Sequence, residues 1–180
     1  MQVAAAHLTM QSVRNSSLIA AAALSISVVV DQVSKNWIRT TLAPGESFPL
    51  FGPVTITHVQ NTGSVFGLGQ GLVLIPTVAS IIVLALIPIT LFHLYRRHKI
   101  WPTTLEMLCV GLVAGGALGN LVDRIALGHV TDFVYVLLPG GVYWPAFNVA
   151  DACIVVATIA LLFLLVRRGV FDDGEQTTPM

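Results

Sequence analysis

Residues 72–95 form an apolar stretch of 24 residues without Asp, Glu, Lys or Arg. A helix of this length, at a rise of about 1.5 Å per residue, crosses the roughly 30 Å hydrocarbon core of a bilayer. Three further apolar stretches lie at residues 16–37, 103–122 and 147–166. Only 10% of the residues are charged, 55% are hydrophobic, and the mean hydropathy is +0.83. We therefore expect a membrane all-α fold with four transmembrane helices in a single domain, residues 1–180.

The segments that connect the expected helices differ in composition. Residues 40–71 combine several prolines and glycines with a period-two alternation at 54–59, which predicts an extramembrane loop containing a small β-sheet. Residues 123–146 are rich in aromatic and turn residues typical of a bilayer interface, and we expect a second loop on the same side. Residues 169–180 are polar, and we expect a disordered tail. His58 has no second histidine at ligand spacing, which favours a structural role.

The basic residues indicate how the chain is oriented. Six of the nine lysines and arginines fall at one end of the four-helix arrangement: Arg14, Arg96, Arg97, Lys99, Arg167 and Arg168. Because cytoplasmic loops carry an excess of Lys and Arg, we expect both termini in the cytoplasm and both large loops on the outer, periplasmic side of the membrane. The net charge is zero and no basic arm is present in the sequence, so nucleic acid is not expected as a partner.

Polar groups cluster near the outer ends of the expected helices. Sixteen or 17 residues separate Asp31, Asn120 and Asp151 from the inner ends of their helices, which is roughly 25 Å of helical rise. The three groups should therefore meet at one level, near the outer boundary of the hydrocarbon. Ionisable groups are costly in membrane sequence, so a cluster of them indicates a functional site. Asp31 and Lys35, four residues apart, share a helical face and can form an ion pair.

The residue types restrict the chemistry of this site. The sequence contains no Gly-x-Ser-x-Gly motif, and its histidines and cysteines form no metal-ligand set, so neither a metal nor another cofactor is expected. Two close carboxylates can share one proton, so that one activates water while the other protonates a carbonyl oxygen, as in aspartic proteases. Spacing leaves open which two of the four aspartates form such a pair: Asp31, Asp123, Asp132 and Asp151.

Other functions use the same residue types. A small proton- or ion-coupled transporter would employ membrane aspartates and a lysine as ion ligands. No inverted repeat relates the first two expected helices to the last two, which argues against that alternative. A scaffold protein would leave the clustered carboxylates unexplained.

Five separated motifs, taken together, resemble those of the bacterial lipoprotein signal peptidases, also called signal peptidase II. They are Asp31-Gln-x-Ser-Lys35, Asn61-x-Gly-x-x-Phe-Gly67, Gly115-Gly-Ala-x-Gly-Asn-x-x-Asp-Arg124, Val130-x-Asp-Phe133 and Phe147-Asn-x-Ala-Asp151. They occur in the family's order and extend across all four expected helices.

The resemblance implies an intramembrane aspartyl endopeptidase of the bacterial inner membrane. Such an enzyme removes the signal peptide of prolipoproteins by cleaving before the diacylglyceryl-modified cysteine, close to the outer leaflet. By motif, the catalytic pair is Asp132 and Asp151. The implied supporting and substrate-binding residues are Asp31, Lys35, Asn61, Asn120, Asp123, Arg124 and Asn148. The implied partners are lipidated prolipoproteins, membrane lipids and peptide inhibitors of the globomycin type.

Overall fold

The computed structural model describes residues 2–63, 73–98 and 101–168. Its helices are α1 (Gln2–Thr41), α2 (Leu74–His93), α3 (Thr104–Leu127) and α4 (Val149–Arg167), and a π-helical turn, η2 (Leu94–His98), follows α2. Its strands are β1 (Ser47–Phe51), β2 (Val54–Asn61), β3 (Val130–Leu137) and β4 (Tyr143–Phe147). The strands form one antiparallel sheet in the order β1-β2-β3-β4.

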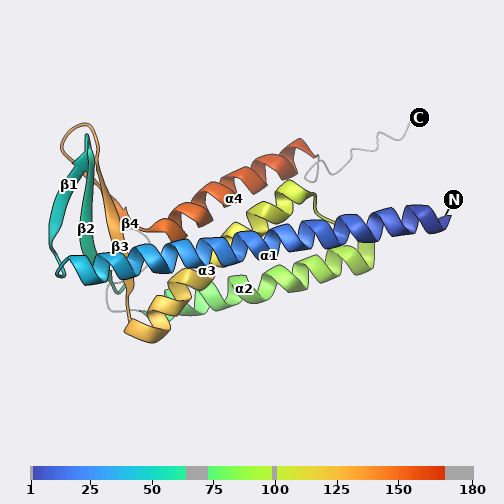
Figure 1. Cartoon of the computed structure of the whole chain (residues 1–180), viewed down its shortest axis with the longest axis horizontal. Helices are drawn as coiled ribbons and strands as arrows, with labels where there is room; N and C mark the ends of the chain where they lie inside the picture. Colours follow the sequence, from blue (N-terminus) through green and yellow to red (C-terminus); the bar gives the residue numbers. More distant parts are fainter. Residues whose placement is uncertain (1, 64–72, 99–100, 169–180) are drawn as a thin grey trace, which may run out of the picture.

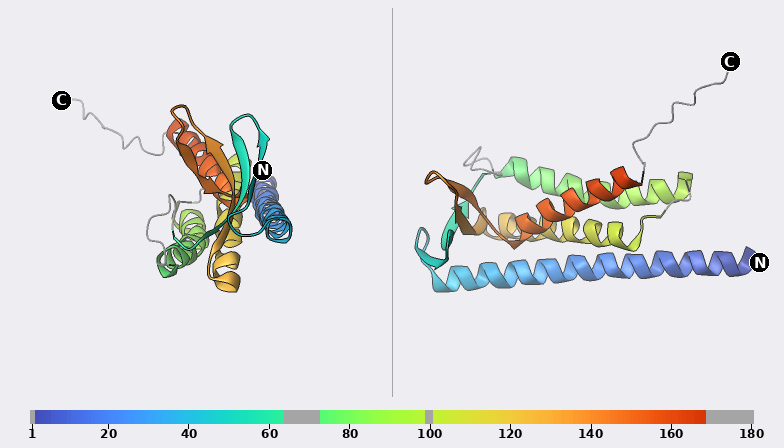
Figure 2. Two further views of the ribbon diagram at one scale, coloured as in Figure 1. Left: turned by 90° about the vertical axis from the view of Figure 1, so that its left-hand side faces the viewer. Right: turned by 90° about the horizontal axis from the view of Figure 1, so that it is seen from above.

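The helices run side by side, and the sheet lies across one end of them (Figure 1). The start of α1 and the end of α4 lie at the opposite end, an arrangement that the right-hand view of Figure 2 also shows. Each of the four helices is long and apolar enough to cross a membrane. The expected fold class, four spanning helices with a small extramembrane sheet, is therefore confirmed.

Helix α3 is the centre of the bundle. In its most apolar 18-residue stretch 61% of the residues are buried, against 22% or less in the other three helices. Its glycines allow the close approach. A side-chain carbon at Gly111 or Gly115 would collide with the backbone of α1, and one at Gly116 would lie 2.5 Å from the carbonyl oxygen of Ala150 in α4. Small residues thus let three helix backbones meet where the polar residues are found.

Side-chain caps define the starts of α3 and α4. Thr103 and Glu106 form a capping box at the start of α3, and Asn148 and Asp151 form another at the start of α4. Such a box satisfies two backbone N–H groups at a helix start. Helix α3 ends at Gly128, whose φ of 73° lies in the left-handed region that glycine favours. Asp151 is therefore held within the first turn of α4.

Helices α1 and α3 are longer than the apolar stretches predicted, because polar residues at their ends continue the helical hydrogen bonding, whereas α2 and α4 are slightly shorter than predicted. Helix α1 extends beyond residues 16–37 at both ends, and α3 continues through Asp123 to Leu127, into the segment that we expected to be loop. The rest of that segment is also more regular than expected, since it supplies β3 and β4. Residues 64–72 and the expected tail, 169–180, lie outside the described residues.

Candidate functional site

Helix α1, together with Leu42 just after its end, presents a buried stripe to the rest of the protein. Ser27, Asp31, Lys35, Ile38 and Leu42 are each at most 8% exposed and are separated by three or four residues, the spacing of one helical face. The stripe carries polar side chains where α3 and α4 pack against α1 and apolar ones where β2 and β3 do.

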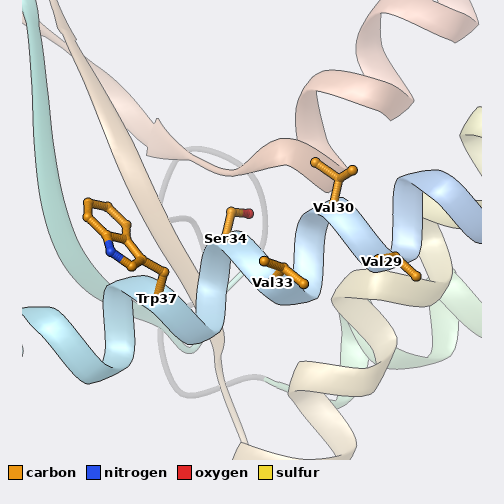
Figure 3. A pocket seen from close by; sticks show the side chains of 5 residues that line it. All are labelled: Val29, Val30, Val33, Ser34 and Trp37. Carbon is orange, nitrogen blue, oxygen red and sulfur yellow. The ribbon is translucent and has the colours of Figure 1, made fainter.

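Another side of α1 is apolar and exposed. Val29, Val30, Val33 and Trp37, with Ser34 among them, line a shallow hollow on the helix surface (Figure 3). This surface suits contact with lipid acyl chains, whereas the buried stripe is closed off by protein.

Lys35 is the cation at the centre of the buried cluster. Its Nζ lies 2.8 Å from Oδ2 of Asp31 and 3.4 Å from Oδ2 of Asp123, and it donates a 2.9 Å hydrogen bond to Oδ1 of Asn120. The side chains of Lys35 and Asp31 are fully buried. The predicted pair is thus present, and Lys35 joins α1 to α3 as well. A charge so deeply buried requires partners of this kind.

Asp31 also connects α1 to α4, because its Oδ1 accepts a 3.0 Å hydrogen bond from the backbone N–H of Ala150. Gln32 supports the same junction. Its Nε2 donates to Oδ2 of Asp31, to the carbonyl oxygen of Gly119 and to Oδ1 of Asp123, at 3.1 to 3.2 Å. The positions of three helices are therefore fixed relative to one another by one carboxylate and one amide.

Asp123 has a second cation, Arg39, whose Nη1 lies 3.3 Å from its Oδ1 and 3.2 Å from the hydroxyl of Thr131. The backbone N–H of Thr131 donates to the other oxygen of Asp123 at 3.0 Å. Asp123 thereby ties the start of β3 to α3. Arg124 donates a 3.4 Å hydrogen bond to the carbonyl oxygen of Asn120 in its own helix.

Asp132 and Asp151 are held by amides. Asn61 and Asn148 donate hydrogen bonds of 2.8 Å and 2.6 Å to the two oxygens of Asp132. Asp151 accepts a 2.8 Å hydrogen bond from the side-chain amide of Asn120 and a 3.2 Å hydrogen bond from the backbone N–H of Asn148. Asn148 therefore contacts both aspartates, and it also donates to Oδ1 of Asn120 at 3.1 Å.

The surroundings of Asp132 change its acidity. Burial raises the pKa of Asp132 to about 7, and the negative charge of Asp151 acts in the same direction. The hydrogen bonds from Asn61 and Asn148 and the charge of Lys35 oppose the increase in pKa. A carboxyl group with such a pKa can hold or release a proton at neutral pH, as a general acid requires.

The structure thus brings together the side chains that the sequence singled out: Asp31, Lys35, Asn61, Asn120, Asp123, Asp132, Asn148 and Asp151. Arg124 is adjacent through its bond to Asn120. Gln32, Arg39 and Thr131 also belong to the cluster, and the sequence analysis did not select them as site residues. Gln32 belongs to the first motif and Thr131 stands within the fourth, whereas Arg39 lies outside all five motifs. Residues 64–67 of the Asn61 motif lie outside the described chain.

Four spanning helices around a buried cluster of aspartates, amides and one lysine define an integral membrane protein with an internal carboxylate site. Comparison with known proteins identifies the family. Residues 23–167 match the family model described as signal peptidase (SPase) II. The chain is 37% identical over 150 residues to the lipoprotein signal peptidase of Dehalococcoides mccartyi, covering 83% of this chain and 90% of that protein. It is 39% identical over 143 residues to that of Syntrophomonas wolfei, covering 79% and 89%.

Two solved structures, described as bacterial membrane enzymes, have the same fold. They align with TM-scores of 0.68 and 0.65 at 28% and 30% identity, covering 91% and 84% of this chain and 94% and 92% of theirs. The chain therefore belongs to the signal peptidase II family, as its five motifs predicted. It is an enzyme of the protease class, and these similarities do not support the transporter hypothesis.

Proposed function

We propose that the chain cleaves prolipoproteins before the diacylglyceryl-modified cysteine, with Asp132 and Asp151 as its catalytic pair. The assignment depends on one difference among the four aspartates: two of them form ion pairs with a lysine and two do not. Asp31 and Asp123 form ion pairs with Lys35. Within the described chain, no lysine or arginine nitrogen lies within 4.0 Å of Asp132 or Asp151. The ion pairs occupy Asp31 and Asp123 with cations, whereas two close carboxyl groups held by neutral amides can share one proton.

The chemistry follows from that shared proton. Asp151 accepts a proton from the attacking water while Asp132, with its pKa raised to about 7, protonates the carbonyl oxygen of the scissile peptide. The water oxygen bonds to the carbonyl carbon. The carbon–nitrogen bond then breaks as Asp151 gives its proton to the leaving nitrogen and a hydroxyl of the tetrahedral intermediate returns a proton to Asp132, so that the pair regains its starting state.

The three amides have a second proposed role, in addition to orienting the carboxylates. Asn61, Asn120 and Asn148 each contact an aspartate, and an amide can both donate and accept. We propose that they also bind the substrate backbone across the scissile bond. Peptide inhibitors of the globomycin type would then compete with substrate for the same groups.

The membrane supplies the other half of substrate recognition. The acyl chains of the lipidated cysteine anchor it in the outer leaflet, and the exposed apolar surfaces of the helices contact the surrounding lipid. We propose that the sheet lies outside the cytoplasmic membrane and that the opposite end of the bundle, with Arg14, Arg96 and Arg167, faces the cytoplasm. The site would then lie at the depth of the anchored cysteine.

Single cysteines test this orientation in a background that lacks Cys109 and Cys153. Val142→Cys, in the exposed connection between β3 and β4, should react with an impermeant maleimide in spheroplasts. Arg96→Cys should react only after the membrane is opened. The reverse pattern would place the sheet in the cytoplasm and exclude the proposed orientation.

Cleavage itself is tested with purified protein in detergent. A precursor peptide with a diacylglyceryl-modified cysteine and the same peptide without lipid are incubated with the protein, and the products are identified by mass. The proposal requires cleavage immediately before the lipidated cysteine and much slower cleavage of the unlipidated peptide. Equal cleavage of both would show that lipid does not position the substrate.

A further inference from the structure

His58 in β2 is a buried polar residue outside the aspartate cluster. It is 4% exposed, and its Nδ1 lies 2.8 Å from the carbonyl oxygen of Leu42, just after the end of α1. Because a carbonyl oxygen only accepts hydrogen bonds, Nδ1 carries the hydrogen. His58 Nε2 has no hydrogen-bond partner among the described residues. The contact with Leu42 is therefore the hydrogen bond that orients the ring.

The strand pairing around His58 contains an irregularity. Ile56 pairs with Val134, and the next recorded pair is Val59 with Asp132. Strand β2 thus advances by three residues where β3 advances by two, so β2 contains one extra residue at position 57 or 58. This is a β-bulge, and such bulges redirect side chains next to functional sites.

The bulge decides which face of the sheet Asn61 occupies. If the register of Ile56 and Val134 continued unchanged, Asp132 would lie opposite His58, and Asn61 would be on the other face. Because side chains alternate along a strand, one extra residue moves every later side chain to the opposite face. With the bulge, Asn61 pairs with Val130 on the face of Asp132. Its amide there donates the 2.8 Å hydrogen bond to Asp132.

Three hydrogen bonds hold His58 against residues 42–46, the segment that connects α1 to β1. Its backbone N–H donates to the carbonyl oxygen of Glu46 at 3.0 Å, and its carbonyl oxygen accepts from the N–H of Gly45 at 2.8 Å. The ring bond to Leu42 is the only one of the three that depends on the side chain. Leu42 itself belongs to the core formed with Ile38, and α1 carries Lys35 and Asp31 about two and three turns before Leu42.

We propose that His58 is a positioning residue for peptide cleavage, which holds the β2 bulge against α1 and thereby places Asn61 on Asp132. This inference rests on the proposed function, because Asp132 must be catalytic for the placement to matter. It differs from a purely stabilising role in one measurable way. The amide of Asn61 lowers the pKa of Asp132, against the opposing effects of burial and the charge of Asp151. Losing that amide would raise the pKa of Asp132 further.

Two polar substitutions separate the nitrogen positions of the ring. His58→Asn places an amide nitrogen near the position of Nδ1, so it keeps the donor to Leu42. His58→Gln places its amide nitrogen near Nε2 and loses that donor. We expect His58→Gln to lower kcat by about tenfold or more, since small misplacements of catalytic groups are that costly. The alkaline limb of its pH profile should move to higher pH. His58→Asn should retain both wild-type values, as should the control Gln60→Ala at an exposed position of β2.

A double-mutant cycle with Asn61→Ala identifies the route of the effect. If His58 acts through Asn61, then His58→Gln should cause little further loss of kcat in the Asn61→Ala background. Additive losses would overturn the inference. A His58→Gln protein with a lower melting temperature but wild-type kcat and pH profile would overturn it as well.

A readout that does not need turnover keeps this test independent of the proposed function. The side-chain amide signal of Asn61, in protein with isotope-labelled asparagine, should shift in His58→Gln and not in His58→Asn. If the wild type fails to cleave the lipidated peptide, the proposed function fails while this signal still reports on the bulge. If His58→Gln does not fold, His58→Asn decides: wild-type kcat supports the inference, and the kcat of Asn61→Ala contradicts it.

Discussion

The side-chain amide of Asn148 donates a 2.6 Å hydrogen bond to Oδ1 of Asp132, and this bond joins the start of α4 to strand β3. The amide oxygen of Asn148 accepts the backbone N–H of Asp151 at 2.9 Å, as a helix N-cap. One residue thus aligns both members of the proposed catalytic pair. Its capping function and its contact with Asp132 use different atoms, so substitution can separate them.

Asn148→Ser should keep the cap and lose the contact with Asp132, because serine is a good N-cap residue but lacks the amide nitrogen. We expect the melting temperature to stay close to wild type while kcat falls severalfold. Asn148→Ala should lose the cap as well, at about 1 kcal/mol of folding stability. Thermal unfolding in detergent, measured beside the cleavage rate, distinguishes the two variants. Equal melting temperatures for Ser and Ala would show that the cap contributes nothing to stability.

Lys35 is expected to be the most sensitive charged residue for stability. Lys35→Met keeps most of the side-chain volume but leaves Asp31 and Asp123 buried without this cation. Removing one partner of a buried ion pair costs about 3 to 5 kcal/mol. Thermal unfolding should show a large loss, whereas Arg14→Met, at an exposed position near the other end of α1, should show almost none. Similar melting temperatures for both variants would show that the ion pairs of Lys35 contribute little to stability.

Gly119 is expected to tolerate no side chain, because a Cβ there would lie 2.6 Å from Oδ2 of Asp31. Asp31 has little room to move, since Lys35 and the N–H of Ala150 hold its two oxygens. Gly119→Ala should therefore destabilise the protein by about 1 to 3 kcal/mol, the usual cost of overpacking, and should reduce cleavage. Ala126→Ser adds one atom at an exposed position of the same helix and serves as the control. A fully active, stable Gly119→Ala would show that α1 and α3 can separate without consequence.

Much of this arrangement could be predicted from sequence because it depends on helical geometry. The level at which Asp31, Asn120 and Asp151 meet follows from a constant rise per residue, and hydrogen bonds between α1, α3 and α4 confirm that they come together. The sharing of one face by Asn148 and Asp151 was also predictable, since residues three apart on a helix are neighbours.

The sheet was harder to predict because its pairing is not local. Val130–Leu137 is rich in β-branched residues, but it pairs with β2, about 70 residues earlier in the chain, and no local pattern shows that partner. The bulge at Thr57 and His58 is invisible for the same reason. The division of the aspartates also needed distances, because spacing alone does not show which of Asp123, Asp132 and Asp151 lies next to Lys35.

The raised pKa of Asp132 predicts how stability depends on pH. The folded state binds this proton up to a pH of about 7, whereas the unfolded chain releases it near the ordinary value of about 3.9. The folded protein therefore holds more protons between these values, and the stability contributed by protonated Asp132 is lost as pH rises through about 7. The melting temperature of wild type should fall from pH 5 to pH 8, by more than that of Asp132→Asn, over this window of about three pH units. A steeper fall of the melting temperature in Asp132→Asn would show that protonated Asp132 does not stabilise the folded protein.

The catalytic pair itself gives the strongest test. Asp132→Asn and Asp151→Asn keep the shape of the side chain but cannot exchange the shared proton, so each should lower kcat by about a thousandfold or more. Both variants should still fold and bind the lipidated peptide. The double variant should be hardly slower than either single one, because residues that act as one unit have non-additive effects. Single-turnover cleavage with separate peptide-binding measurements provides both quantities.

Asp123→Asn is the matched control, since Asp123 is as deeply buried as Asp132 but is paired with Lys35 and Arg39. Asp123→Asn should reduce folding stability and lower the cleavage rate only in part. The remaining activity should still depend on two ionisations. A protein with Asp132→Asn that cleaves at the wild-type rate, beside an Asp123→Asn protein that does not cleave at all, would move the catalytic assignment to Asp123 and Asp151. Lys35 and Arg39 would then have to leave Asp123 during turnover, because the carboxylate of a catalytic acid or base must contact the substrate or the attacking water.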